Sequence, residues 1–173
     1  MSRNILFVCH GNICRSPMAE FIFKRMVRRA GLEEQFQVAS AATSSEEVGN
    51  PVYPLAKRTL AEHGIGCPGK TARQVEPDDY RRYDFIVGMD EANRNNLLDL
   101  FGGDPEGKVS LLLDHTPASD TEHHGRDVAD PWYTRKFNIA YDDINIGCQA
   151  LFDALEPEAR AEADKAASQA RNE

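Results

Sequence analysis

The sequence lacks any long hydrophobic run. Its first apolar stretch, Ile5 to Val8, follows Met1-Ser2-Arg3-Asn4 and is too short for the apolar core of a secretory signal. No later stretch approaches the roughly 20 apolar residues that a membrane-spanning helix requires. These absences predict a cytoplasmic protein that does not insert into a membrane.

The chain also lacks an excess of positive charge and has few cysteines. Its 20 Lys and Arg against 28 Asp and Glu give a net charge of −8, which disfavours nucleic acid or an anionic membrane surface as the main partner. Four cysteines without an export signal do not predict a disulfide framework. The rest is typical of a globular protein, since 173 residues with 41% hydrophobic content suit one domain with a real core.

Strand and helix patterns alternate along the chain. Strands are predicted at 4–8, 36–42, 83–88 and 109–113, and helices at 16–31, 54–63, 90–101 and 137–155. The alternation predicts an α/β fold, a single three-layer domain over residues 1–155 with a parallel sheet covered by helices on both faces. Residues 156–173 are charged and Ala-rich, with only alanine as apolar content, so a frayed helix or disordered tail is expected there.

The loop from Cys9 to Ser16 joins the first predicted strand to the first predicted helix. Ligands of open α/β sheets bind beyond the carboxyl ends of the strands, where backbone N–H groups and a helix N-terminus favour an anion. Gly11 lets the backbone turn, and Asn12 tolerates a left-handed conformation.

Such a loop gives Cys9 and Arg15 a chemical role. The N–H groups and the guanidinium favour the thiolate of Cys9, which is a nucleophile. The planar fork of Arg15 suits two oxygens of a phosphoryl group, and the hydroxyl of Ser16 can donate to the sulfur. This pattern favours a phosphate-binding loop over a buried cysteine beside a surface arginine.

The run Val8-Cys9-His10-Gly11-Asn12-Ile13-Cys14-Arg15-Ser16-Pro17-Met18-Ala19-Glu20 resembles the signature of the low-molecular-weight protein tyrosine phosphatases. In larger tyrosine phosphatases a histidine precedes the cysteine and the signature lies deep in the chain. The similarity continues at 40–43, 49–51, 72–74, 85–90 and 130–133, so it spans about residues 3–155. It implies a four-stranded sheet in the order 2-1-3-4, a phosphotyrosine-containing protein as substrate, a monomer or weak dimer, and no cofactor or metal.

The resemblance also implies roles for residues outside the loop. Asp130, in an Asp-Pro motif, is the implied general acid, and one carboxylate can protonate the leaving oxygen and then activate water. Trp132 and Tyr133 are implied to form a wall against the phosphotyrosine ring. Substrate contacts are expected from His10, Gly11, Asn12, Ile13, Cys14 and Ser16, and support of the loop by hydrogen bonds from Asn12, Ser16 and Ser40.

Several positions depart from the family pattern. His10 stands where relatives often carry an aliphatic or small residue, Glu46 and Glu47 occupy a rim that commonly carries an aromatic, and Lys70 replaces the supporting histidine of some members. The loop at 116–126 is longer than usual.

Cys14 has two interpretations of equal weight. The resemblance suggests a reversible disulfide with Cys9 under oxidant, which would protect the nucleophile from irreversible oxidation. The alternative is a small buried residue on the first helical turn. Cys67 and Cys148 are expected to pack or to be exposed without a chemical role.

Two other patterns compete with the loop. Residues 64–71 match the nucleotide-binding pattern GxxxxGK[ST] and by themselves predict a kinase, but a helix pattern precedes them and Pro77 interrupts any long helix afterwards, which favours a turn. One polar segment contains side chains that could bind a metal ion. Its histidines show no helical pairing at i and i+4, so a solvated loop is favoured. Its candidate ligands are His115, His123, His124, Asp114, Asp120 and Asp127.

Two further chemistries occur on the same fold. Arsenate reductases need another cysteine pair to relay a disulfide, and no such close pair follows Cys14. Protein arginine phosphatases carry threonine where this chain has Ile13, whose aliphatic side chain suits an aryl ester. The predicted function is therefore hydrolysis of phosphotyrosine through a phosphocysteine, with Cys9 as nucleophile, Arg15 as phosphate clamp and Asp130 as general acid and base.

Overall fold

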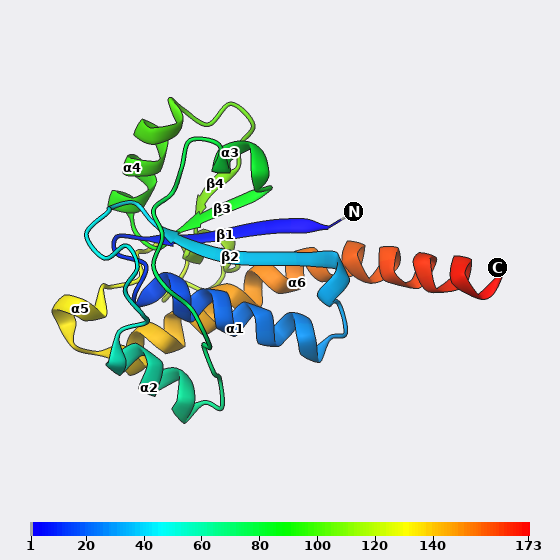
Figure 1. The fold of residues 1–173 in the computed structure, drawn as a ribbon, viewed down its shortest axis with the longest axis horizontal. Coiled ribbons are helices and arrows are strands. Elements are labelled where there is room, and N and C mark those ends of the chain that lie inside the picture. The colour runs from blue at the N-terminus through cyan, green and yellow to red at the C-terminus, as the bar shows by residue number, and fades with distance from the viewer. Residues whose placement is uncertain (1) are drawn as a thin grey trace.

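Four parallel strands form the centre of the structure, a computed structural model in which residues 2–173 are described. The strands are β1 (Arg3–Cys9), β2 (Phe36–Ala42), β3 (Phe85–Gly88) and β4 (Val109–Leu111). Their order is β2-β1-β3-β4, which confirms the predicted sheet. β1 pairs with β2 up to the partners Cys9 and Ala42, so the central strand ends at the cysteine (Figure 1).

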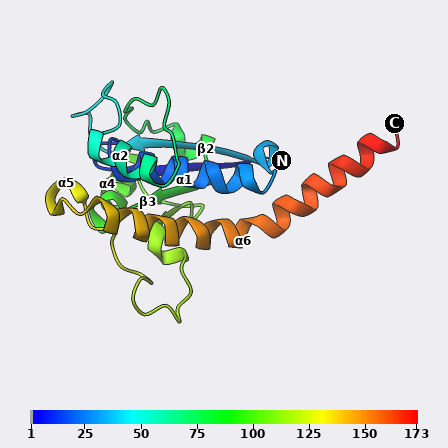
Figure 2. The ribbon, with the colours of Figure 1, turned by 90° about the horizontal axis from the view of Figure 1, so that it is seen from below.

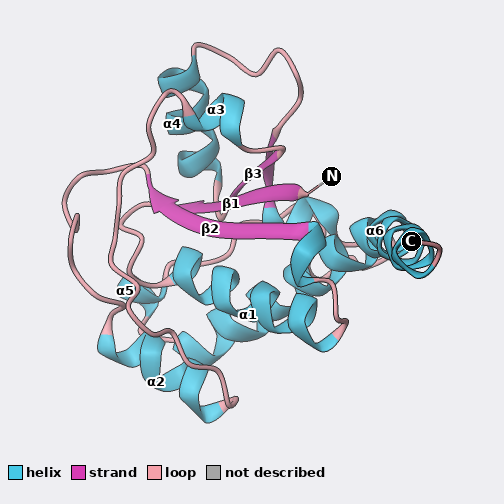
Figure 3. Cartoon of the chain, turned by 45° about the vertical axis from the view of Figure 1, so that its right-hand side comes forward, coloured by secondary structure: helices cyan, strands magenta, loops and turns pink. Residues whose placement is uncertain are grey.

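Helices cover both faces of this sheet, as predicted. On one side lie α1 (Arg15–Arg29), α2 (Pro54–Glu62) and α6 (Phe137–Arg171), and on the other α3 (Asp79–Arg82) and α4 (Glu91–Phe101) (Figure 3). The short α5 (Pro131–Thr134) lies at the carboxyl ends of the strands. Two 3₁₀ turns, Glu33–Gln35 and Leu112–His115, complete the described helical elements.

The position of β1 between two layers of helices explains why its residues are continuously apolar. Ile5 and Phe7 belong to the core beneath α1 and α6, where the Phe7 ring lies 5.7 Å from that of Phe23. Leu6 and Val8 belong to the second core, on the side of α4. Because successive residues of a strand point to opposite faces, burial of both faces requires apolar residues at every position.

The structure corrects some predicted boundaries. The fourth strand ends at Leu111, and Leu112 and Leu113 turn into a 3₁₀ helix while remaining fully buried. The third strand begins at Phe85 rather than at 83. The four-residue helices α3 and α5 were not predicted, since one turn is too short to show a helical period.

Helix α6 continues well beyond the predicted end at Leu155. It runs for 35 residues to Arg171 with Pro157 inside it, and Figure 2 shows it bending before it projects from the body of the protein. A proline removes one helical hydrogen bond and bends the axis, which accounts for that change of direction. Among the helices of residues 2–173, none is long and apolar enough to cross a membrane.

Candidate active site

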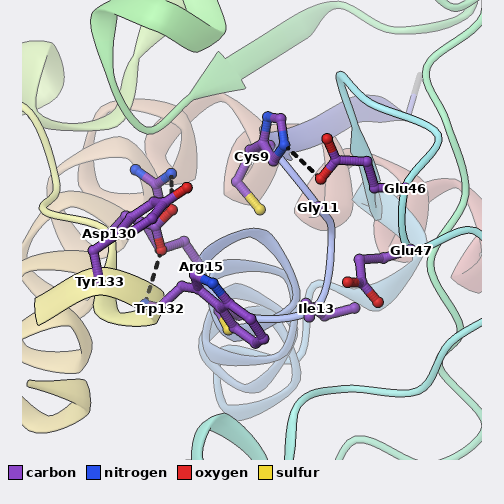
Figure 4. Close-up of a pocket in the computed structure, with 11 residues that line it drawn as sticks. Cys9, Gly11, Ile13, Arg15, Glu46, Glu47, Asp130, Trp132 and Tyr133 are labelled. Carbon is purple, nitrogen blue, oxygen red and sulfur yellow. Dashed lines mark hydrogen bonds and ion pairs between the residues drawn. The ribbon is translucent and has the colours of Figure 1, made fainter. Parts of the chain in front are cut away.

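A pocket opens where the strands end and α1 begins (Figure 4). It brings together the loop after β1, the loop after β2 and the start of α5, which are far apart in the sequence. Parallel strands place their carboxyl ends at one edge of a sheet, and this is where such folds bind ligands. The lining residues are Cys9, His10, Gly11, Ile13, Cys14, Arg15, Glu46, Glu47, Asp130, Trp132 and Tyr133.

The backbone of the loop curls through one left-handed residue. Asn12 has a φ of 59°, as its side-chain type predicted. Gly11, expected to supply the turn, is absent from the left-handed glycines; instead, a Cβ there would lie 3.4 Å from Cγ of Glu47. α1 begins at Arg15, one residue earlier than predicted, and Pro17 stands in its first turn, where a missing N–H breaks no helical hydrogen bond.

Cys9 is 3% exposed and lies at the bottom of the pocket. Its Sγ is 3.0 Å from Oγ of Ser16 and accepts the backbone N–H of Ser16 at 3.4 Å. Asn12 Nδ2 donates to Ser16 Oγ at 2.8 Å and to Ser40 Oγ at 2.9 Å. The structure thus brings the three residues expected to support the loop into one buried network with the cysteine.

Arg15 is held by three partners from two separate segments, the start of α4 and the loop before α5. Nη1 donates to Asp90 Oδ2 at 2.7 Å and to the carbonyl of Val128 at 2.8 Å, and Nη2 donates to Asp130 Oδ2 at 3.3 Å. Burial opposes its charge, but Cys9 and the two carboxylates raise the pKa of the guanidinium above its ordinary value. Asp90 was not predicted as a site residue, although its position between the end of β3 and the start of α4 is a usable signal.

Asp130 is positioned by the short helix that follows it. Its Oδ1 accepts the backbone N–H of Trp132 at 3.0 Å, so it caps α5 and its other oxygen faces Arg15. Figure 4 shows the carboxylate beside the guanidinium on one side of the pocket. A carboxylate in this place can exchange a proton with a group bound above the loop.

Two aromatic residues of α5 line the same side of the pocket. Trp132 is 44% exposed and Tyr133 is 80% exposed, so both present ring surface to an incoming group. Trp132 packs edge-on against Tyr53 with ring centroids 5.0 Å apart, and Arg135 Nη2 donates to the Tyr53 hydroxyl at 2.9 Å. No local pattern in the sequence marks Tyr53 or Arg135, since their roles arise only from this contact.

The opposite rim is acidic. His10 Nε2 lies 3.1 Å from Glu46 Oε2, and Glu47 Oε2 accepts from Asn50 Nδ2 at 2.6 Å. In Figure 4 both glutamates stand across the pocket from Asp130 and Trp132. A substrate therefore enters between an aromatic wall and a negatively charged one.

The four cysteines are all free thiols in different surroundings. Cys14 is 5% exposed and lines the pocket; burial, together with the charge of Cys9, raises the pKa of its thiol to about 12. Cys148 is fully buried in the core, where burial raises its pKa. Burial also raises the pKa of Cys67, which is only partly covered.

The competing patterns take other arrangements in the structure. Residues 64–71 follow the helix α2 instead of a strand, and the next helix, α3, begins only at Asp79. Lys70 donates to the carbonyl of Ser40. Among residues 2–173 no group of three His, Cys, Asp or Glu side chains is arranged to hold a metal ion. The histidines of that segment have other partners. His115 contacts Ser110, His123 contacts Asp120, and His124 contacts Thr116.

The chain matches one known family along nearly its whole length. A sequence model described as "Low molecular weight phosphotyrosine protein phosphatase" matches residues 4–161. The chain belongs to this family. Its membership makes it a protein tyrosine phosphatase, a hydrolase that acts on phosphoproteins.

Individual members of the family are similar over most of their length. The low molecular weight protein-tyrosine-phosphatase YfkJ of Bacillus subtilis is 37% identical over 90% of this chain and 97% of its own. The low molecular weight phosphotyrosine protein phosphatase of Homo sapiens is 42% identical over 88% of this chain and 95% of its own. The crystal structure of YfkJ superimposes with a TM-score of 0.86 at 36% identity, covering 91% of this chain and 97% of the other.

Proposed function

We propose that the protein hydrolyses phosphotyrosine in two steps, with Cys9 as the nucleophile. The thiolate attacks phosphorus, an S–P bond forms, and the bond to the tyrosyl oxygen breaks as Asp130 gives that oxygen its proton. Asp130 then takes a proton from water, whose oxygen attacks phosphorus and displaces the thiolate. Arg15 and the loop N–H groups stabilise the negative oxygens in both steps.

One observation carries this proposal: Cys9 Sγ, the Arg15 guanidinium and the Asp130 carboxylate share one pocket, and the last two lie 3.3 Å apart. The same guanidinium can therefore hold a phosphoryl group beneath the acid that protonates its leaving oxygen. Ser16 Oγ, at 3.0 Å from the sulfur, can donate to the departing thiolate. Asn12 and Ser40 support that hydroxyl from behind.

The shape of the pocket favours an aryl phosphate. Because Cys9 is 3% exposed, a phosphorus atom must lie well inside the protein to reach it. A phosphotyrosine ring spans that depth and can pack against Trp132 and Tyr133, whereas a phosphoserine side chain is too short. Ile13 adds an aliphatic surface to the lining, which suits a ring better than the charged guanidino group of phosphoarginine.

Replacement of Cys9 by serine tests the nucleophile. We expect Cys9→Ser to abolish release of para-nitrophenol from para-nitrophenyl phosphate while inorganic phosphate still binds, because the loop N–H groups and Arg15 are kept. Turnover by this variant near the parent rate would refute the assignment. The same variant, used to capture phosphoproteins, would identify substrates.

Replacement of Asp130 by alanine tests the acid. Leaving groups that need protonation most, such as phenols of high pKa, should slow by about 10²–10⁴-fold, while the activated nitrophenolate slows far less. An equal loss for all leaving groups would remove Asp130 from this role. Because Asp130 also contacts Arg15 and caps α5, Asp130→Asn is a useful companion variant. Asparagine keeps an oxygen for the cap on α5 but cannot act as the acid.

We also propose that Cys14 can form a disulfide with Cys9 under oxidant. Peroxide converts the Cys9 thiolate to a sulfenic acid, and attack by Cys14 sulfur forms the S–S bond with loss of water. Both side chains line one pocket, which supports their approach. Peptide mass spectrometry after peroxide treatment should find the bond, and a reductant should restore activity; a Cys14→Ser variant should be inactivated irreversibly.

The proposal extends to the cellular compartment and the oligomeric state of the protein. Four free thiols, one of them the nucleophile, suit a reducing compartment, so we infer a cytoplasmic location. We also propose, from the family resemblance alone, a monomer or weak dimer in solution. Fractionation of the cells that make the protein tests the first inference, and sedimentation velocity over a range of concentrations tests the second.

A further inference from the structure

Asp143 is a buried carboxylate of α6 that takes no part in the two-step reaction. Its side chain is 6% exposed, whereas the neighbouring Asp142 is exposed to solvent. A buried carboxylate is strongly unfavourable unless a cation or hydrogen-bond donors pair with it, so its partners are firmly held. Those partners belong to the loop that leads into Asp130, the residue proposed as the general acid.

We propose that Asp143 is a positioning residue for Asp130. It acts through Arg126, which connects α6 to residues 126–130, the acid-bearing segment. This inference rests on the proposed role of Asp130 in protonating the leaving oxygen.

The ion pair between Arg126 and Asp143 has the two-point geometry that arginine forms with a carboxylate. Nη2 of the guanidinium donates to Oδ1 at 2.8 Å, and Nη1 donates to Oδ2 at 2.9 Å. The hydrogen bonds to Asp143 raise the pKa of Arg126 above its ordinary value, so the side chain stays charged. His123 adds a second contact, with its Nε2 3.7 Å from Oδ1 of the same carboxylate. Asp143 therefore contacts two residues of one loop.

The guanidinium of Arg126 also holds the backbone of this loop. Its Nε donates to the carbonyl of Glu122 at 2.9 Å, and Nη1 donates to the carbonyl of Asp127 at 3.1 Å. Because the donors of arginine lie in one rigid plane, these bonds and the pair with Asp143 fix each other. The position of Asp127 is therefore tied to α6, shortly before the chain reaches Asp130.

The acid-bearing segment belongs to no helix or strand, so its place depends on contacts of this kind. Asp127 Oδ1 accepts the backbone N–H of Glu91 at 3.1 Å. The N–H of Val128 donates to the carbonyl of Met89 at 2.8 Å. These contacts hold the segment on the side of the sheet, and the guanidinium holds it on the side of α6. Loss of one anchor should therefore displace the acid without unfolding the segment.

Trp132 gives a signal from this segment that does not depend on turnover. It is the single tryptophan of the chain, and its backbone N–H donates to Asp130 Oδ1 at 3.0 Å. Its ring is 44% exposed and packs edge-on against Tyr53. A shift of the acid-bearing segment therefore changes the exposure of the ring to a quencher such as acrylamide.

The experiment compares Asp143→Asn with Asp142→Asn in the full-length protein. The two substitutions remove the same charge from adjacent positions of α6, and the first removes the charged partner of Arg126. The ratio kcat/KM is measured with phenyl phosphate, whose leaving oxygen needs a proton, and with dinitrophenyl phosphate, whose leaving group is stable as an anion. Acrylamide quenching of the Trp132 fluorescence is measured in parallel.

The two variants should differ in both measurements. For Asp143→Asn we expect kcat/KM to fall about five- to tenfold with phenyl phosphate and less than about twofold with dinitrophenyl phosphate, because the acid is displaced. Quenching of Trp132 should rise. Asp142→Asn should change each kcat/KM by less than about twofold and leave quenching unchanged.

A role of Asp143 in stability alone predicts another result. A variant that is less stable but correctly folded loses the same fraction of activity with both phosphates, and the quenching of its folded fraction is unchanged. Equal losses with the two phosphates, or equal quenching for the two variants, overturn the proposal. Circular dichroism and urea unfolding establish that each variant is folded under the assay conditions.

A double-mutant cycle tests the route through Arg126. If Asp143 acts through this arginine, Asp143→Asn should change kcat/KM with phenyl phosphate by less than about twofold in an Arg126→Gln background. Additive effects of the two substitutions overturn the proposal.

Should Asp143→Asn fail to fold, Arg126→Lys provides the second route. The arginine side chain is 41% exposed, and lysine keeps its charge but not the two-point geometry. The selective loss with phenyl phosphate and the rise in Trp132 quenching should therefore appear in this variant as well. Unchanged values overturn the proposal.

Asp130→Ala, measured with the same two phosphates, separates this inference from the proposed function. If Asp130→Ala slows phenyl phosphate selectively and Asp143→Asn does not, the positioning role alone is wrong. If Asp130→Ala slows both phosphates equally, the acid itself is wrongly assigned, and the positioning role fails with it.

Discussion

Arg15 and Asp90 form an ion pair at the edge of the sheet, with Nη1 of the arginine 2.7 Å from Oδ2 of the carboxylate. Arg15 is 2% exposed and Asp90 20%. Asp90 is itself fixed, because its Oδ1 accepts the N–H of Asn93 at 2.8 Å as the cap of α4. The start of one helix therefore anchors the guanidinium that projects from the start of another.

Loss of this anchor should weaken catalysis more than folding. We expect Asp90→Ala to lower kcat/KM by about 10–100-fold, because Arg15 loses a fixed orientation, and to lower the free energy of unfolding by about 1–3 kcal/mol. Steady-state kinetics and urea unfolding measure the two effects. Asp99→Ala, on the exposed face of the same helix, is the control and should alter neither; an unchanged kcat/KM for Asp90→Ala would contradict the anchoring role.

The thiol of Cys14 should make stability fall in alkali. Burial raises its pKa from the ordinary 9.0 to about 12, so between these values the folded state keeps a proton that the unfolded state loses. The free energy of unfolding therefore decreases as pH rises through this window, by up to about 1.4 kcal/mol per pH unit for one proton. Urea unfolding across the window should show that the free energy of unfolding declines less steeply with pH for Cys14→Ala than for the parent. Cys67→Ala, the control, should reduce the slope of this decline by less than Cys14→Ala does.

The same burial predicts selective alkylation. Near neutral pH Cys14 is a thiol, and thiols are poor nucleophiles, so iodoacetamide should label Cys9 and leave Cys14 and Cys148 unlabelled in the folded protein. Peptide mass spectrometry gives the label at each site. Inorganic phosphate should protect Cys9; labelling of Cys14 at a comparable rate would contradict the buried, protonated thiol.

The acidic rim should oppose the binding of free phosphate. We expect Glu46→Gln and Glu47→Gln each to lower the inhibition constant of inorganic phosphate by about two- to fivefold at low salt, because a like charge near the anion is removed. The gain should shrink as ionic strength rises. Glu33→Gln, at the opposite end of the sheet beside the start of β2, is the matched control. A salt-independent effect would point to a change of shape instead of charge.

The boundary between domain and tail should fall later than residue 155. Ala159 is fully buried, and Arg3 at the start of β1 pairs with Glu158 and Glu162 of α6. We propose that a chain ending after Leu155 is less stable than the parent by about 1–3 kcal/mol, whereas one ending after residue 166 is unchanged. Thermal unfolding of the two truncated proteins distinguishes these results, and equal melting temperatures would restore the earlier boundary.

Local features of the sequence were sufficient for much of the fold and for the loop. Strands buried on both faces and amphipathic helices each have a period that repeats along the chain, so the alternation of β and α elements could be predicted. The cradle of residues 9–16 could also be predicted, since its turn, its nucleophile and its arginine are neighbours in sequence. Asp130 required the family resemblance, because a lone Asp-Pro pair is more often a turn.

Only the tertiary structure decided which residues distant in sequence are in contact. The pairing of Arg15 with Asp90, the support of Trp132 by Tyr53, and the pairing of Arg126 with Asp143 each join segments that no local period relates. The length of α6 is of the same kind. Its alanines are too small to mark a buried face by pattern, and Ala159 is buried because α6 passes close to the start of β1, where Arg3 pairs with Glu158.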